Sequence, residues 1–262
     1  MDITSVLVVL VAAFCAGGVN ALAGGGTAIS FPGFVWAGLP ATVANATNAF
    51  ALIPGSLGGA YSFREELKPQ SRRLATFLIP AILGSLAGAS VLATSNGDTF
   101  KKIVPFLVLM ATIVFAFSKP INAWARTLGK NNTTPSGEIS RSGYGIGVIV
   151  QFCIAFYGGY FGAGMGILML SLMGIIGMTD LRKMNALKNV LAAAINTTAV
   201  IRFFAANSIN VAYGLVGAVG ALAGGYLMGR MAKRIPQPYV RGFVIVFGCV
   251  ATVWLLYRAF AA

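Results

Sequence analysis

Histidine is absent from this 262-residue sequence, and acidic residues number only six. None of them lies within the long apolar runs of the chain, and the six are Asp2, Glu65, Glu66, Asp98, Glu138 and Asp180. General acid–base catalysis relies mostly on histidine and carboxylates, so a membrane enzyme would have few catalytic candidates. Carboxylates also serve most cation pathways within membranes, so their scarcity argues against a carrier of metals or drug cations.

Cysteine is scarce as well, with three copies at Cys15, Cys153 and Cys249, all within apolar segments. No paired spacing connects them, so neither a disulfide framework nor a Cys/His metal site is expected. The three thiols are interpreted as small hydrophobic side chains. We therefore expect no metal site and no cofactor.

Charge of either sign makes up only 10% of the chain, whereas a soluble domain carries about 25%. Uncharged runs cover Ile3–Phe63, Leu74–Gly97, Ile103–Ser118, Ser142–Thr179, Phe203–Gly229 and Gly242–Tyr257. A membrane-spanning helix needs about 17–25 mostly apolar residues. The sequence therefore predicts an all-α polytopic protein embedded in a lipid bilayer.

The apolar runs divide into two sets of five segments. The first set is expected at about Ile3–Leu22, Ala28–Gly38, Ala41–Phe63, Leu74–Ser95 and Ile103–Ser118. The second set is expected at about Ser142–Tyr160, Gly164–Met178, Arg182–Ala206, Ile209–Gly229 and Tyr239–Phe260. The polar stretch between them, with "GKNNTTPSGE", is typical of a linker. The expected organisation is a first repeat (1–118), a cytoplasmic linker (119–141) and a second repeat (142–262).

The two sets share one order: a helix, a glycine break, a short helix and three longer helices. Sliding the sequence by 140 residues places Gly24 on Gly164, Gly26 on Gly166 and Gly84 on Gly224. Fourteen lysines and arginines lie in the loops at 64–73, 119–141, 179–183 and 230–241, against three on the opposite side. The positive-inside rule then places both termini outside the cytoplasm, and the two repeats are inverted relative to each other. These loops account for the net charge of +13, so no nucleic-acid partner is expected.

The stretch "GGVNALAGGGTAISFPGF", Gly17–Phe34, is the first glycine break, and "GGYFGAGMGI" is its counterpart. A nucleotide-binding loop is excluded at Gly24–Gly26 because no "GK[ST]" follows and no strand precedes. Inverted-repeat transporters bind substrate near the bilayer midplane, where such broken helices meet. Amides at the start of a half-helix favour an anion, so Gly24–Thr27 and Gly162–Gly166 are expected to supply them. At Gly84, Gly88, Gly217, Gly220, Gly224 and Gly225 we expect close helix packing instead.

Lys188 is the sharpest polar signal, because an ionisable side chain inside a membrane helix is usually functional. It lies about two turns into its helix, so snorkelling to the interface is the competing explanation. Asparagines near the breaks are expected to donate to the anion, and hydrogen bonding between helices, which needs no substrate, is the competing explanation. The candidate substrate-binding residues are Asn20, Gly24, Gly25, Gly26, Thr27, Asn45, Asn48, Gly164, Gly166, Asn185, Lys188 and Asn189.

Both glycine-containing regions carry a family resemblance. "GGVNALAGGGTAISFPGFVWAGLPATVANATNAFALIPGSLGGAYSFR" resembles the first signature of the TauE/SafE family of sulfite exporters and toluene sulfonate uptake permeases, and "GGYFGAGMGILMLSLMGIIGMTDLRKMNALKNVLAAAIN" is similar to the second. The resemblance implies a bacterial inner-membrane permease for a small sulfur-containing anion, such as sulfite, sulfoacetate or another organosulfonate. Met165 departs from the pattern by interrupting the second glycine cluster.

The sequence thus predicts an alternating-access secondary transporter that exports such an anion. Three alternatives stay open: a cation or metal permease that uses unwound backbone carbonyls, a membrane enzyme, and a non-transporting assembly protein. The sequence also leaves a homodimer open.

Overall fold

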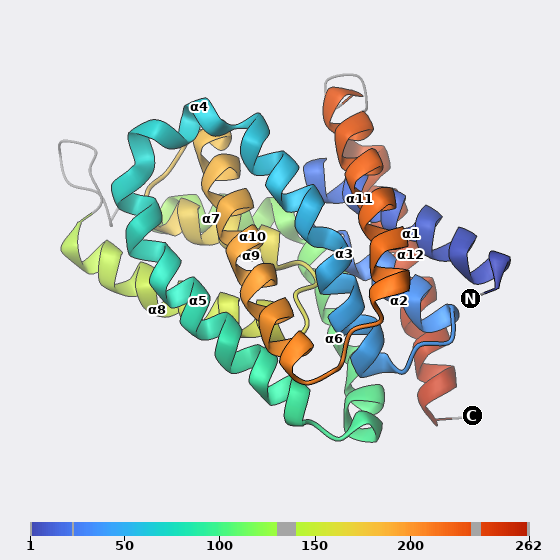
Figure 1. Ribbon diagram of the computed structural model, residues 1–262. Coiled ribbons are helices and arrows are strands. Elements are labelled where there is room, and N and C mark those ends of the chain that lie inside the picture. Colours follow the sequence, from blue (N-terminus) through green and yellow to red (C-terminus); the bar gives the residue numbers. More distant parts are fainter. Residues whose placement is uncertain (1, 23, 130–139, 232–236, 261–262) are drawn as a thin grey trace.

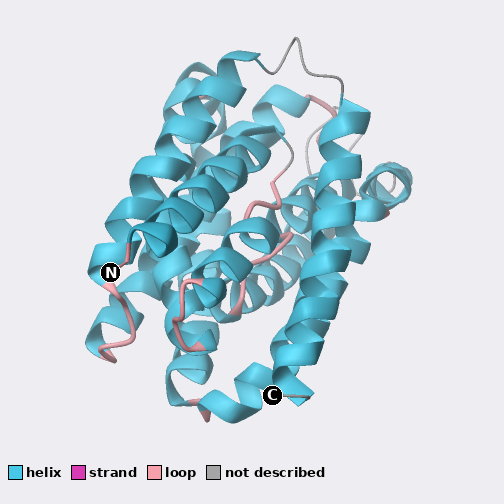
Figure 2. Cartoon of the chain, turned by 90° about the vertical axis from the view of Figure 1, so that its right-hand side faces the viewer, coloured by secondary structure: helices cyan, strands magenta, loops and turns pink. Residues whose placement is uncertain are grey.

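All regular elements in the described part of the chain are helices, as Figures 1 and 2 show. The computed structural model describes residues 2–22, 24–129, 140–231 and 237–260. The first half holds α1 (Ile3–Leu22), α2 (Thr27–Trp36), α3 (Ala41–Ser62), α4 (Arg64–Leu67), the 3₁₀ turn η1 (Lys68–Gln70), α5 (Ser71–Thr94) and α6 (Gly97–Ala116). The second half holds α8 (Arg141–Tyr160), α9 (Met165–Ile175), α10 (Leu181–Ala205), α11 (Val211–Met231) and α12 (Gln237–Phe260). The all-α prediction is confirmed, and a helix covers each of the ten expected segments.

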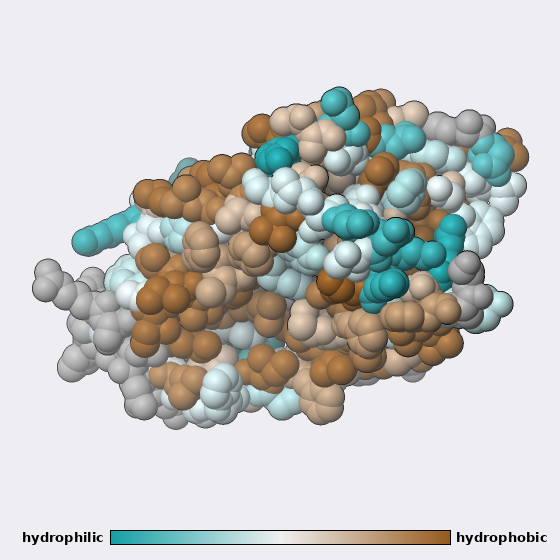
Figure 3. Space-filling view, turned by 90° about the horizontal axis from the view of Figure 1, so that it is seen from below, coloured by the Kyte–Doolittle hydropathy of each residue, from teal (hydrophilic) through white to brown (hydrophobic). Residues whose placement is uncertain are grey.

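Six helical stretches within the described residues are long and apolar enough to cross a membrane. They lie in α1, α5 with the preceding α4 and η1, α6, α8, α11 and α12. These helices expose large apolar side chains such as Leu7, Ile79 and Val253, and Figure 3 shows broad apolar areas on one face of the molecule. Because lipid is the natural neighbour of such a surface, the chain is a multi-pass membrane protein.

Four further helices differ from these six stretches: α3 and α10 are long but more polar, and α2 and α9 are too short to span. α3 and α10 have 22 and 25 residues but carry internal asparagines, and α10 also carries Lys188. The short helices α2 and α9 have 10 and 11 residues, which corresponds to about 15 Å of length. That is half of a hydrocarbon core about 30 Å thick. These four helices pack on one another in the interior, where α3 contacts α10, α2 contacts α3 and α9 contacts α10.

Two close helix seams hold this interior between the outer helices. α1 packs along α11, and α8 packs along α5. A Cβ added at Gly224 would overlap the carbonyl of Phe14, and one added at Gly84 would overlap the carbonyl of Phe152. Added Cβ atoms at Gly88 and Gly220 would likewise overlap facing carbonyls, and one at Gly217 would lie 2.8 Å from the side chains of Ala51 and Phe34. The packing role expected for these five glycines is therefore confirmed. Gly225 differs, since its added Cβ would lie at an ordinary 3.6 Å from the carbonyl oxygen of Gly17.

The two basic segments at 64–73 and 179–183 lie at the same end of the molecule. The Gln70 Nε2 donates to the carbonyl of Lys183 at 3.2 Å, and Arg182 lies 3.9 Å from the carboxylate of Glu66. The turns that join α5 to α6 and α10 to α11 lie at the opposite end, as Figure 1 shows. One end of the bundle therefore gathers basic side chains from both halves.

The first part of the expected linker is a helix, α7 (Ser118–Gly129), in a stretch for which the sequence had predicted no helix. Charges and prolines in this stretch suggested a loop, but its apolar face is buried against α9. Ala125 is fully buried, and the Ser171 Oγ donates to the Asn122 Oδ1 at 3.0 Å. Residues 130–139, with the "NNTTPSGE" part of the linker, lie outside the described residues.

Candidate functional site

The two broken segments have matching backbone conformations. Gly24 and Gly162 both have positive φ, at 76° and 81°. Each amide donates to the carbonyl five residues earlier, Val19 for Gly24 and Tyr157 for Gly162. A left-handed glycine with such a bond is the usual way to end a helix. Both α1 and α8 therefore stop inside the bundle, and a short helix begins three residues after each glycine.

The two breaks touch each other. A Cβ added at Gly24 would lie 3.2 Å from the Cα of Gly166, and one added at Gly166 would lie 3.0 Å from the Cα of Gly24. Only glycine at both positions allows this approach of one backbone to the other. The start of α2 and the start of α9 consequently converge on one region of the interior.

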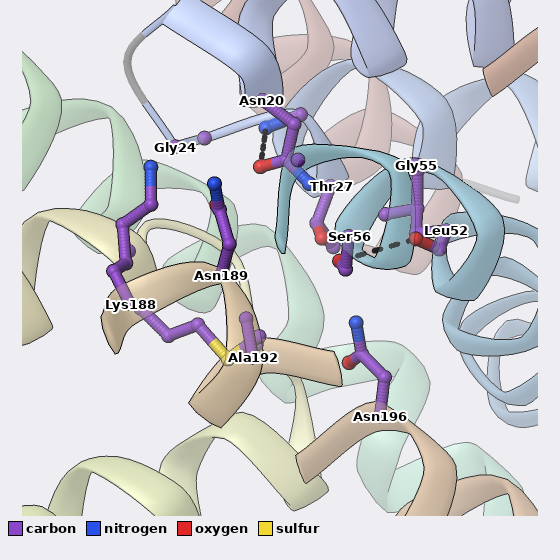
Figure 4. A pocket seen from close by; sticks show the side chains of 16 residues that line it. Asn20, Gly24, Thr27, Leu52, Gly55, Ser56, Lys188, Asn189, Ala192 and Asn196 are labelled. Atoms are coloured by element: carbon purple, nitrogen blue, oxygen red, sulfur yellow. Dashed lines mark hydrogen bonds between the residues drawn. The ribbon is translucent and has the colours of Figure 1, made fainter. Parts of the chain in front are cut away.

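A small enclosed cavity lies where the breaks meet, and Figure 4 shows the side chains around it. Its volume of about 30 Å³ is room for about two water molecules. Residues of α1, α2, α3, α9 and α10 and of the loops that follow α1 and α8 line it: Asn20, Gly24, Gly25, Gly26, Thr27, Leu52, Gly55, Ser56, Gly59, Gly162, Met165, Gly166, Lys188, Asn189, Ala192 and Asn196. Among these residues the polar side chains are amides, hydroxyls and one ammonium, and none is a carboxylate.

Lys188 supplies the charge of the cavity. Its side chain is only 3% exposed, and its Nζ makes no hydrogen bond with any residue that the structure describes. In Figure 4 the Nζ points toward Gly24, and a Cβ added at Gly24 would lie 3.5 Å from it. A buried charge is costly unless a partner compensates it. Snorkelling does not describe this side chain, because its nitrogen faces the interior of the bundle.

Eight of the twelve residues expected to bind substrate line this cavity. They are Asn20, Gly24, Gly25, Gly26, Thr27, Gly166, Lys188 and Asn189. The two glycine breaks and the second-half helix α10 supply all of them. Their role in binding stays a prediction, but their placement together is a property of the fold.

Asn20 lines the cavity and also makes a local hydrogen bond. Its Oδ1 accepts a hydrogen bond from the amide of Gly26 at 3.4 Å, drawn as a dashed line in Figure 4. The side chain thereby occupies one of the first amides of α2, which have no acceptor within the helix. Gly25 and Gly26 also have packing roles, because added Cβ atoms would meet Phe115 and the carbonyl of Ala16. The glycine triplet thus combines close packing with the approach to the cavity.

Four expected residues lie away from the cavity. The Asn45 Nδ2 donates to the carbonyl of Tyr160 at 3.0 Å, and the Asn185 Nδ2 donates to the carbonyl of Leu181 at 2.9 Å. Asn48 is buried near the start of α3, and its Oδ1 has no partner among the described residues. Gly164 has φ 78° and forms the N-cap of α9. The cavity faces the later turns of α3, from Leu52 to Gly59, so residues in its first turns cannot reach it.

The sequence reasoning missed Ser56 and Asn196 as cavity residues. The same 140-residue shift that pairs Gly84 with Gly224 also pairs Ser56 with Asn196 and Leu52 with Ala192, and all four line the cavity. That shift was an available signal. The Ser56 Oγ donates to the carbonyl of Leu52 at 3.2 Å, within its own helix. Gly59 was also missed, and an added Cβ there would meet the Asn189 Nδ2 at 2.7 Å.

Comparison with known proteins agrees with this architecture. The family model described as "Sulfite exporter TauE/SafE" matches residues 9–255. A "Probable membrane transporter protein" of Haemophilus influenzae is 26% identical over 246 residues, which cover 93% of this chain and 91% of that protein. The "Probable membrane transporter protein YfcA" of Escherichia coli K12 is 25% identical over 249 residues, which cover 94% and 87%.

A third relative, the "Probable membrane transporter protein ORF9" of Sinorhizobium sp, is 27% identical over 249 residues, covering 94% of this chain and 90% of that protein. No solved structure matches this chain. The family match spans nearly the whole chain, both breaks and Lys188 included. The chain therefore belongs to the TauE/SafE family of membrane transporters.

Proposed function

We propose that this transporter is an alternating-access permease that exports a small sulfur-containing anion, sulfite or an organosulfonate such as sulfoacetate. One observation carries the proposal: the ammonium of Lys188 is buried beside two converging helix breaks and has no protein partner among the described residues. An anion in the cavity would compensate that charge and meet the positive ends of α2 and α9. The family description supplies sulfur as the central atom of the proposed substrate.

Asn189, Asn196, Thr27 and the first-turn amides near Gly166 would donate to the oxygens of the anion. Sulfite and sulfonate present three oxygens, so they can accept from these donors and from the Lys188 ammonium at once, and hydrogen bonds to an ionised acceptor are strong. The donors are shared between the two halves of the chain. Binding would therefore draw the halves together around the anion.

Inverted repeats would explain the arrangement, with residues 1–118 and 142–262 as the two units and 119–141 as the cytoplasmic linker. The packing supports this proposal, because each contact has an equivalent when the two repeats are exchanged. The contact of α1 with α11 corresponds to that of α8 with α5, and the contact of α3 with α11 corresponds to that of α10 with α5. α6 packs on α12, and α3 on α10, as helices related by such an axis would. Likewise, the close approach of Gly224 to the carbonyl of Phe14 corresponds to that of Gly84 to the carbonyl of Phe152.

In a bacterial inner membrane, the basic end of the bundle would face the cytoplasm and both termini the periplasm. The cavity holds about two waters, so this conformation encloses the site. Transport would require α3 and α10 to separate, and the contact between Gly59 and Asn189 is the place where they would part. We also propose a homodimer, which would leave this motion possible. The mass of the purified particle in detergent or nanodiscs tests whether the protein is dimeric.

A cation or metal permease is the second candidate, and one observation favours it. The Oδ1 atoms of Asn45 and Asn48 are buried and unpartnered among the described residues, and such oxygens could face a cation. They lie outside the cavity, and the ammonium of Lys188 would repel a cation from the cavity itself. We therefore rank the anion first.

A thermal-shift screen of the purified transporter tests the choice. Sulfite, thiosulfate, sulfate, sulfoacetate and short organosulfonates form one arm, and Na⁺ with divalent metals forms the other. Stabilisation by at least one sulfur anion, absent with matched chloride, is the expected result. Stabilisation by cations alone would favour the second candidate, and no response to any sulfur anion would refute the proposed substrate class.

A further inference from the structure

The environment of Lys188 raises a question about its charge when the cavity holds no anion. The Nζ is buried and unpartnered within the described structure, beside the breaks that precede α2 and α9. Helix N-termini carry partial positive charge, so both neighbouring helix ends oppose an ammonium there. Removing a charge from water without a partner costs several kcal/mol. The neutral amine avoids most of that cost.

No acidic group in the described structure compensates the ammonium. Glu66 of α4 lies 3.9 Å from Arg182 at the end of the bundle, and Asp180 caps the first turn of α10. Neither of the two ion pairs found among the described residues involves Lys188.

The remaining ionisable groups on helices packed against α10 also leave Lys188 alone. Tyr157 of α8 donates its hydroxyl to the carbonyl of Ala163 at 2.6 Å, so that proton is already bonded. Tyr61 of α3 is 69% exposed, and Arg72 and Arg73 lie in the first turn of α5, away from the cavity. Lys188 is thus the one ionisable side chain that lines the cavity among the described residues.

The binding of an anion in the cavity and the binding of a proton by Lys188 are therefore linked. An anion in the cavity stabilises the ammonium, and the ammonium stabilises the anion, so each raises the affinity of the site for the other. The empty cavity favours the neutral amine instead. A carrier that returns empty would then return without the proton.

We infer that Lys188 carries a proton across the membrane together with the anion, one proton for each anion. The inference rests on the proposed function. The step balances: the amine lone pair takes a proton from water on the side to which the cavity opens, and the ammonium crosses paired with the anion. On the other side the anion leaves and the ammonium gives its proton back to water. An N–H bond therefore forms as an O–H bond breaks on loading, and the reverse happens on release. With a monovalent anion the complete cycle moves no net charge.

The test uses the full chain in proteoliposomes with methanesulfonate as the probe. This anion is the base of a strong acid, so it carries no proton itself at neutral pH, and any proton that moves with it must move on the protein. A pH-sensitive dye in the lumen records protons, and radiolabelled methanesulfonate records anions. An inward anion gradient should acidify the lumen by one proton per anion, equally with and without a potassium–valinomycin voltage clamp.

Lys188→Arg separates charge from proton release, because arginine stays protonated. This variant should keep exchange of labelled for unlabelled methanesulfonate but lose net uptake and lumen acidification at least tenfold. Lys188→Met should lose both fluxes. Lys183→Arg, at an exposed position on the same helix, is the matched control and should behave as the unaltered protein does.

The outcomes separate the two levels of the account. Net methanesulfonate uptake by the unaltered protein without lumen acidification would overturn the inference and leave the proposed function standing. Acidifying net uptake by Lys188→Arg would overturn it as well. If Lys188→Arg fails to fold, the proton-to-anion ratio of the unaltered protein decides alone. The absence of any organosulfonate or sulfite flux in the unaltered protein would overturn both.

Discussion

The first-half and second-half sides of the cavity share a frame but differ in chemistry. Corresponding positions of the two halves line it: Gly24 and Gly162, which end α1 and α8, and the pairs Leu52 with Ala192 and Ser56 with Asn196, which the 140-residue shift matches. The first half contributes neutral groups and backbone, whereas the second half contributes Lys188 and Asn189. Under the proposed function, a near-symmetric frame would suit a site that opens to either side in turn, and the charge of Lys188 would favour an anion. The two halves thus contribute similar backbone to the cavity, but only the second half contributes an ionisable side chain to it among the described residues.

Removing the Lys188 side chain should have the largest effect on anion binding. Lys188→Ala is expected to lower anion affinity by a factor of 30 to several thousand, which is the range for losing one partner of a buried charge pair, about 2–5 kcal/mol. Uptake of labelled sulfite into proteoliposomes and equilibrium binding measure this. Because the substitution removes a buried nitrogen that has no hydrogen-bond partner among the described residues, the anion-free variant should melt no lower than the unaltered protein. Unchanged uptake would refute the role of Lys188.

The two left-handed glycines test whether the frame is symmetric while the charge is not. Gly24→Ala and Gly162→Ala should each lose about 1–2 kcal/mol of unfolding free energy, because a side chain disfavours positive φ. Only Gly24→Ala places a methyl group 3.5 Å from the Lys188 Nζ and 3.2 Å from the Cα of Gly166. Sulfite affinity should therefore fall about tenfold for Gly24→Ala and much less for Gly162→Ala. Equal losses of sulfite affinity in the two variants would contradict the proposal that Lys188, which lies beside Gly24, binds the anion.

The matched polar pair Ser56 and Asn196 should give a smaller difference. The Ser56 hydroxyl already donates to Leu52 within α3, whereas the Asn196 side chain lines the cavity from α10. Asn196→Ala is expected to weaken anion binding about fivefold to tenfold, or about 1 kcal/mol, the usual worth of one hydrogen bond. Ser56→Ala should change it less than twofold. Titration of both variants with sulfite measures the difference, and the reverse order would be inconsistent with the proposed donors.

The two packing seams should show no difference at all. Gly84→Ala and Gly224→Ala each insert a methyl group against a carbonyl, that of Phe152 or that of Phe14. Overpacking of this kind costs about 1–3 kcal/mol, so both should lower the melting temperature by similar amounts. Gly225→Ala, with an ordinary 3.6 Å contact, is the control. A large loss for one seam and none for the other would break the proposed equivalence of the halves.

Much of this architecture is readable from the sequence. The uncharged runs locate the helices, and Gly24 and Gly162 stop α1 and α8 within the bundle because glycine alone accepts positive φ without cost. Lys188 is identifiable because a charge within an apolar helix has few structural reasons to be there. The helix α7 was missed because burial against α9, rather than composition, makes it stable.

The cavity itself was only half predictable. Periodicity shows which residues share a helix face, but it does not show at which depth two helices meet. Asn45 and Asn48 were expected at the site for their amides, yet the breaks face α3 one to two turns further along, at Leu52–Gly59. Asn20 lines the cavity as expected, but the sequence did not show that its Oδ1 also accepts from the amide of Gly26.

Equilibrium binding of labelled sulfite to the purified transporter, compared between the unaltered protein and Lys188→Met, tests the central claim most directly. The account predicts saturable binding that sulfoacetate or a short organosulfonate displaces, and loss of that binding in Lys188→Met while the variant remains folded. Saturable sulfite binding of equal affinity in both proteins would contradict it, because the anion would then bind without the buried ammonium.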